Sequence, residues 1–204
     1  MFKKLLQKTP AQKKDSTLIV VSGLPRSGTS MMMNMLAAGG VPVVSDSIRQ
    51  ADEDNPNGYF EFEAVKHLSE GQTDWLAESG GKAVKIVSAL LEHLPAGHPY
   101  KILFMERDIK EILASQSKML TRRKEESRTN DADMEDQFNK HLAAIKYWLA
   151  RQPNMEVLYV DYKQLISDPD KDCPRIAEFI GIAVDVQKMR SVPNASLYRN
   201  RASH

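Results

Sequence analysis

Residues 23–30 read Gly-Leu-Pro-Arg-Ser-Gly-Thr-Ser, and residues of these types can hold an anion. Glycines let the backbone bend so that successive amide hydrogens point at one ion, and the start of a following helix adds partial positive charge. Three hydroxyl donors and the fixed planar charge of Arg26 lie in the same turn. We therefore predict a phosphate- or sulfate-binding loop, with the candidate ligand-binding residues Pro25, Arg26, Ser27, Gly28, Thr29 and Ser30.

This loop departs from the pattern of the nucleotide triphosphatases. Their loop, G-x-x-x-x-G-K-[ST], has a lysine that reaches the β and γ phosphates and a hydroxyl that holds magnesium. Here Thr29 follows Gly28, and the nearby cation is Arg26, inside the loop. The sequence therefore weighs against hydrolysis of ATP or GTP. A strand-to-helix turn that merely uses glycine is the simpler alternative, but it does not account for Arg26 and the hydroxyls.

A second set of polar residues follows a later apolar run. Arg107 comes directly after residues 101–106, which we expect to form a strand, and Asp108 can cap the helix that begins there. Ser115 then lies about two turns into this helix, where its hydroxyl could face back toward a ligand. Arginine makes a bidentate contact with phosphate, although a lone Arg107 would more simply form a surface salt bridge.

The elements that must position these residues alternate along the chain. The run 17–22 is apolar without polar alternation, which is typical of a strand buried on both faces. Strands alternating with helices imply parallel pairing through right-handed crossovers, so we predict an α/β fold of three layers around a parallel sheet. The expected strands are residues 17–22, 82–87, 101–106 and 155–160, and the expected helices are 30–38, 62–78, 108–120, 133–150, 173–181 and 184–190.

Both sets of residues resemble motifs of one family. Residues 24–30 resemble the 5′-phosphosulfate loop of the P-loop sulfotransferases that use 3′-phosphoadenosine 5′-phosphosulfate (PAPS), whose sheet is like that of nucleotide kinases. The arginine form of the loop is similar to that of protein-tyrosine sulfotransferases and small bacterial sulfotransferase-like proteins. Residues 107–115 resemble the family's 3′-phosphate motif, an arginine followed eight residues later by a serine. Softer similarity extends over about residues 16–179, but the family's glycine-rich terminal motif is missing, and Arg199 or Arg201 would have to replace it.

The resemblance implies an enzyme that moves a sulfuryl group from PAPS to an acceptor hydroxyl or amine and leaves adenosine 3′,5′-bisphosphate (PAP). Arg26 and the loop amides would stabilise the negative charge that develops on the leaving oxygen, so the reaction demands no metal. Arg107 and Ser115 would bind the 3′-phosphate. Lys85, in the expected strand 82–87, is a further candidate ligand contact if that strand ends in the cleft.

The reaction also needs a general base within hydrogen-bond reach of the reacting atoms. The candidates in the sequence are Asp46, Glu61, Glu63, His67 and His93. We predict Glu61, because a tight turn and aromatic residues precede it and could hold its carboxylate over the site. The alternative is an exposed carboxylate at the start of the helix expected over residues 62–78, where negative charge is favourable.

The composition argues against several other classes of protein. With 204 residues, 42% of them hydrophobic and 27% charged, the chain is typical of a globular domain, and its net charge of +1 argues against binding nucleic acid or membranes by bulk charge. The single cysteine, Cys173, cannot form an internal disulfide, and no apolar run approaches the roughly 20 residues that a membrane helix needs. We expect a cytoplasmic protein with a flexible basic tail over residues 1–15 and one domain over residues 16–204.

Two alternatives to a sulfotransferase stay open. An ATP-dependent small-molecule kinase of the P-loop class would share the sheet and the loop position and would depend on magnesium. A noncatalytic nucleotide-binding module would keep the pocket without turnover. The sequence does not indicate the acceptor or the oligomeric state.

Overall fold

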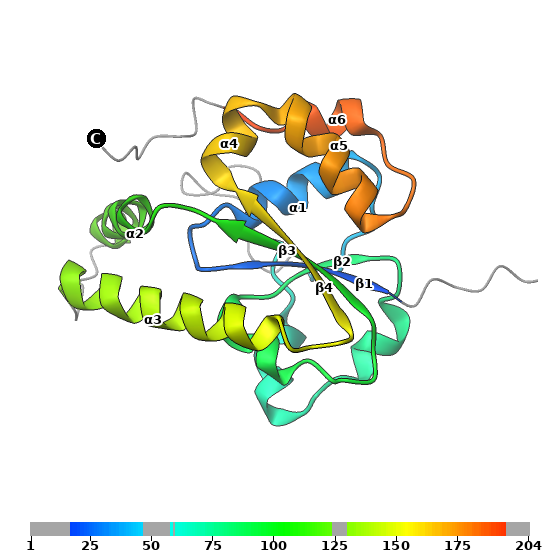
Figure 1. Ribbon diagram of the computed structural model, residues 1–204, viewed down its shortest axis with the longest axis horizontal. Helices are drawn as coiled ribbons and strands as arrows, with labels where there is room; N and C mark the ends of the chain where they lie inside the picture. The colour runs from blue at the N-terminus through cyan, green and yellow to red at the C-terminus, as the bar shows by residue number, and fades with distance from the viewer. Residues whose placement is uncertain (1–16, 47–57, 59, 124–129, 195–204) are drawn as a thin grey trace, which may run out of the picture.

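A parallel sheet of four strands in the order β2-β1-β3-β4 forms the middle layer of the molecule (Figure 1). The computed structural model describes residues 17–46, 58, 60–123 and 130–194. The strands are β1 (Leu18–Gly23), β2 (Ala83–Lys85), β3 (Tyr100–Glu106) and β4 (Met155–Asp161). All six residues of β1 are buried, as expected of the central strand. The predicted α/β class with a parallel sheet is confirmed.

The register of the strands decides which residues meet at the site. Val21 of β1 pairs with Lys85 of β2, and Gly23 pairs with Met105 of β3. Because all the strands are parallel, their carboxyl ends lie at one edge of the sheet. The segments that follow β1 and β3 therefore emerge side by side at that edge, which is where α/β proteins bind ligands.

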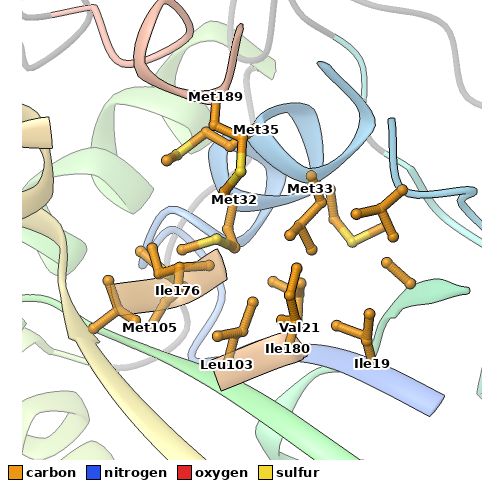
Figure 2. Close-up of a cluster of buried hydrophobic side chains, with 14 of the residues drawn as sticks. Ile19, Val21, Met32, Met33, Met35, Leu103, Met105, Ile176, Ile180 and Met189 are labelled. Atoms are coloured by element: carbon orange, nitrogen blue, oxygen red, sulfur yellow. The ribbon is translucent and has the colours of Figure 1, made fainter. Parts of the chain in front are cut away.

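One face of the sheet is covered by α1 (Thr29–Ala38), α4 (Tyr162–Ser167), α5 (Pro169–Ile180) and α6 (Val186–Arg190) (Figure 1). Methionines of α1 pack on the apolar side chains of β1 and β3, and residues of α5 and α6 complete the cluster. Figure 2 shows this core, with Met32, Met33, Met35, Met189, Ile19, Val21, Leu103, Met105, Ile176 and Ile180 labelled. This packing holds α1 against β1 and so sets the position of the loop between them.

The other face is covered by α3 (Asp131–Leu149) and by the 3₁₀ helices η1 (Glu63–Glu70), η2 (Asp74–Glu78) and η3 (Ser88–His93). Apolar side chains recur at helical spacing along α3, and of these Ile145 and Leu149 are fully buried, whereas Met134 and Phe138 are only partly so. The amino-terminal half of α3 extends beyond the sheet and lies beside α2 (Ile109–Arg123) (Figure 1). That half of α3 is therefore only partly buried, because it packs beside α2 and not on the sheet.

Several predicted boundaries are wrong for local reasons. The helix expected over residues 62–78 is split into η1 and η2, because Gly71, with a φ of 79°, ends the first one. The strand expected over 82–87 has only three residues, since η3 begins at Ser88. The helix expected from Cys173 starts at Pro169, where Asp168 caps the backbone N–H of Lys171.

The short helix α4 was not expected at all, although Asp161 caps it by accepting a 2.6 Å hydrogen bond from the N–H of Gln164. Within the described parts of the chain, no helix has the length and apolar character needed to span a membrane. The predicted basic tail and the arginines at 199 and 201 lie outside the described residues.

Candidate active site

The loop between β1 and α1 has a backbone that only small residues permit at two points. Gly23 and Gly28 have φ values of 145° and 103°. A Cβ at Gly23 would lie 2.7 Å from the carbonyl oxygen of Met105, and one at Gly28 would lie 2.4 Å from Cδ2 of Tyr162. Arg26, although it carries a side chain, also has a positive φ of 70°. Such strain costs about 1–3 kcal/mol and is characteristic of functional loops.

The loop leads into a helix start that suits an anion. Gly28 is the N-cap of α1 and offers no side-chain cap, and the first turn of α1 contains no acidic residue. The hydroxyl of Ser27 is buried and, among the described residues, has no hydrogen-bond partner. A buried hydroxyl without a partner is unfavourable by about 1–3 kcal/mol, so a ligand that accepts its hydrogen would be stabilised there. These features fit a bound phosphate or sulfate group.

The loop and the Arg107 segment are in direct contact. Nε of Arg26 donates a 3.0 Å hydrogen bond to Oγ of Ser115. Nη1 of Arg107 donates a 3.2 Å hydrogen bond to the carbonyl oxygen of Arg26. Asp108 accepts hydrogen bonds from the N–H groups of Lys110 and Glu111, as expected of a residue that caps the start of α2. The structure therefore brings both predicted motifs to one place, with Arg26 between them.

Two residues that the sequence reasoning missed hold Arg107. Nε of Arg107 lies 3.0 Å from Oε2 of Glu111, and the two side chains are only 8% and 5% exposed. The guanidinium carbon of Arg107 lies 4.3 Å from the centre of the Tyr162 ring. The spacing of Arg107 and Glu111 on a helix could have indicated their pairing. Tyr162 lies within the softer similarity over residues 16–179, but no pattern gave it a role, and it reaches the site from α4.

Tyr162 contacts both motifs. Its ring lies where a Cβ on Gly28 would be, and its face lies under the guanidinium of Arg107. Burial raises the pKa of the Tyr162 hydroxyl, and the positive charge of Arg107 acts in the opposite direction. The ring therefore packs as a neutral aromatic surface against a cation, an arrangement that is favourable in a desolvated setting.

Glu61 lies on the other side of the loop. Residues 42–46 run beside β2, since the N–H of Val44 donates to the carbonyl of Ala83 and Val43 forms a parallel bridge with Ala83. The carbonyl oxygen of Glu61 accepts hydrogen bonds from Oγ of Ser45 and from the N–H of Asp46. This segment is two strand spacings from β1, about 10 Å. The backbone of Glu61 thus lies beyond β2, on the β2 side of the sheet, whereas Arg107 contacts the loop directly from the β3 side.

Lys85 lies at the carboxyl end of β2, between these two positions. It pairs with Val21, which faces α1, so the partly buried side chain of Lys85 projects from the same face of the sheet. β2 therefore ends at the same edge of the sheet as the loop. Lys85 stays a candidate ligand contact for this reason.

The other candidate bases make contacts of their own, Asp46 beside Glu61 and the rest farther away. Oδ2 of Asp46 accepts a 2.6 Å hydrogen bond from the N–H of Glu63, whose own carboxylate pairs with Lys66. His67 contacts Glu70 on the surface. His93 is exposed at the end of η3, and the hydroxyl of Tyr100, at the amino end of β3, donates to the carbonyl of Pro95 just beyond it. The described contacts therefore place His93 toward the opposite edge of the sheet.

A glycine loop between a buried strand and a helix, next to an arginine at the end of the neighbouring strand, defines a phosphate-binding protein of the P-loop α/β class. The family model described as "Sulfotransferase domain" matches residues 16–201, and the chain belongs to this family. The fold and family expected from the two motifs are thereby confirmed, and the kinase alternative is not favoured.

A solved sulfotransferase structure agrees with the fold, and a second solved structure is also similar. The sulfotransferase domain of the Synechococcus PCC 7002 olefin synthase is similar with a TM-score of 0.50 and 14% identity, over 95% of this chain and 86% of that one. Mouse sulfotransferase SULT7A1, solved with PAP, has a TM-score of 0.49 and 14% identity, over 92% of this chain and 67% of that one. A search of the curated proteins finds no match.

Proposed function

We propose that this protein transfers a sulfuryl group from PAPS to an acceptor hydroxyl or amine and releases PAP. Its family is that of the sulfotransferases, and its two anion-binding motifs resemble those that bind PAPS. The observation that carries the proposal is the contact of the loop with the Arg107 segment through Arg26. A donor with phosphate groups at both ends of its ribose requires two such sites side by side.

The loop would bind the reactive end of the donor. PAPS, when bound, supplies an activated sulfuryl group. Arg26, the loop amides and the start of α1 provide positive charge at this point, and the buried hydroxyl of Ser27 can donate to an anionic oxygen. Charges and dipoles that are already in position stabilise the negative charge of a transition state without reorganisation, which is commonly the largest catalytic effect. Pro25, Gly28, Thr29 and Ser30 complete the loop.

Arg107 and Ser115 would bind the 3′-phosphate. Arg107 is buried by contacts from α2, α4 and the loop, so little of its conformational freedom is left to lose when a ligand binds. Arginine also offers a planar pair of N–H groups to a phosphate. This contact would distinguish PAPS from nucleotides without a 3′-phosphate.

Glu61 would act as the general base. Its backbone position on the β2 side of the loop leaves the β3 side to Arg107 and the nucleotide. An acceptor entering beside β2 would then meet the carboxylate before it meets the loop. Glu61 would accept the proton of the acceptor as the new bond to sulfur forms.

The proposal is tested by calorimetric titration of PAP and ADP into wild type and into Arg107→Ala. Removing a hydrogen bond from a charged group costs about 1.5–3 kcal/mol, so the variant should bind PAP more weakly by that amount and bind ADP nearly as before. Arg151→Ala is a matched control, because Arg151 also stacks on a tyrosine, Tyr147, but at the far end of α3.

Equal affinities of wild type for PAP and ADP would refute the 3′-phosphate site. The protein would instead be a noncatalytic module if it binds PAP tightly but does not convert PAPS to PAP. This assay supplies alcohols, phenols and amines as acceptors. Substitution of Glu61 by glutamine separates these cases further. It should slow PAP release from PAPS and leave the affinity for PAP unchanged.

A further inference from the structure

Glu111 is a buried carboxylate in the first turn of α2. Its side chain is 5% exposed, and Oε2 lies 3.0 Å from Nε of Arg107. Burial of a charge is unfavourable unless a partner of opposite charge compensates for it. A carboxylate also reduces the positive charge available to a phosphate. Its presence beside Arg107 therefore needs an explanation other than attraction of the ligand.

Arg107 is restrained in three ways by three parts of the chain. The Tyr162 ring, 4.3 Å from the guanidinium carbon, fixes the plane of the group. The bond from Nε to Glu111 fixes its rotation within that plane. The bond from Nη1 to the carbonyl of Arg26 ties it to the loop. Because bidentate recognition of a phosphate depends on the direction of the planar fork, these restraints set where a phosphate can bind.

We infer that Glu111 is a positioning residue that holds the Arg107 guanidinium in the orientation in which it receives the 3′-phosphate of the donor. This inference rests on the proposed function. Glu111 itself makes no contact with the ligand in this role. Its effect passes through Arg107, and it should appear only with ligands that carry a 3′-phosphate.

Two competing explanations predict different results. If Glu111 acts only through its charge, removing it should tighten the binding of PAP, because a negative charge near a phosphate is repulsive. If it only stabilises the start of α2, removing it should lower stability and affect all nucleotides alike, since acidic residues are favourable at helix starts. If it orients Arg107, its removal should weaken the binding of PAP alone.

The experiment compares PAP with AMP, which differ only in the 3′-phosphate, by calorimetry on wild type, Glu111→Ala and Glu111→Gln. Residues that hydrogen-bond a ligand-binding side chain and orient it, as around metal ligands, typically contribute about 10- to 100-fold in affinity. We expect Glu111→Ala to reduce the ratio of PAP to AMP affinity by about tenfold. Glutamine keeps an oxygen that can accept from Nε, so Glu111→Gln should retain most of the ratio.

Controls separate positioning from folding. Asp136→Ala removes the acidic partner of another i,i+4 ion pair, with Lys140, whose side chains are 60% and 76% exposed, and it should leave the ratio unchanged. In an Arg107→Ala background, adding Glu111→Ala should not lower the ratio of PAP to AMP affinity any further. Thermal unfolding of each variant reports folding independently. If Glu111→Ala does not fold, Glu111→Asp carries the test: its shorter side chain withdraws the carboxylate from Nε of Arg107 and should lower the same ratio, whereas Glu111→Gln should retain it.

The possible failures are distinguishable. Wild type that binds PAP no better than AMP contradicts the proposed function itself. If wild type prefers PAP to AMP, and the ratio of the two affinities is unchanged or increased in Glu111→Ala, only the role of Glu111 is overturned. Equal weakening of PAP and AMP overturns it too, because that result indicates a merely structural residue.

Discussion

Replacing Gly28 by alanine tests how closely the loop and Tyr162 are packed. Gly28 has a φ of 103°, and an added Cβ would lie 2.4 Å from Cδ2 and 2.8 Å from Cε2 of the Tyr162 ring. Neither the backbone of the loop nor the buried ring can yield without disturbing its neighbours. The ring would have to move, and it supports the guanidinium of Arg107.

The magnitude has two parts. A left-handed conformation costs a residue with a Cβ about 1–2 kcal/mol, and overpacking of a buried site typically costs about 1–3 kcal/mol. We therefore expect Gly28→Ala to lower the free energy of unfolding by roughly 2–5 kcal/mol, measured by urea denaturation. Displacement of Arg107 should also weaken the binding of PAP by at least about tenfold, measured by calorimetry.

Gly40→Ala is the matched control. Gly40 has a similar φ of 94°, but nothing lies within 4 Å of its added Cβ, so only the backbone strain of about 1–2 kcal/mol applies. In a Tyr162→Ala background, the cost of Gly28→Ala should fall to that of Gly40→Ala. If Gly28→Ala is no more destabilised than Gly40→Ala and binds PAP normally, the reasoning about this contact is refuted.

Two further predictions concern residues outside the loop. Burial raises the pKa of Tyr100 to about 12, so its stabilising contribution is complete below about pH 10, where an unfolded tyrosine ionises, and is lost as the pH rises toward 12. The urea midpoint of wild type should fall more steeply over this range than that of Tyr100→Phe, and parallel curves would contradict this assignment. Asp161→Ala removes the cap of α4 and should cost about 1 kcal/mol of stability. Its affinity for PAP should stay within about twofold of wild type, and a larger loss would give Asp161 a role at the site.

The local conformation of the binding elements could be predicted from sequence. The apolar run of β1 indicated a strand buried on both faces, and the glycines that follow indicated a tight turn into a helix. Asp108 was expected to cap the helix that follows it, and it does. Each of these signals involves residues within a few positions of one another, because backbone conformation, helix capping and burial periodicity are local properties.

Other elements depended on packing that no local pattern contains. The amino-terminal half of α3 has the same apolar period as the buried half, yet it lies beyond the sheet. β2 is only three residues long because η3 begins soon after it. The side of the loop on which Glu61 lies follows from the pairing of residues 42–46 with β2, which the sequence did not indicate.

By itself, the sequence determined the loop, the Arg107 and Ser115 spacing and, through them, the family. Only the tertiary structure decided that Arg26 meets Ser115, 89 residues away, and that Tyr162 packs on both Gly28 and Arg107. The physical reason is that bending a backbone or capping a helix involves near neighbours in the chain. The orientation of a buried guanidinium, in contrast, is set by side chains from separate elements, and these meet only when the parallel sheet brings the ends of its strands to one edge.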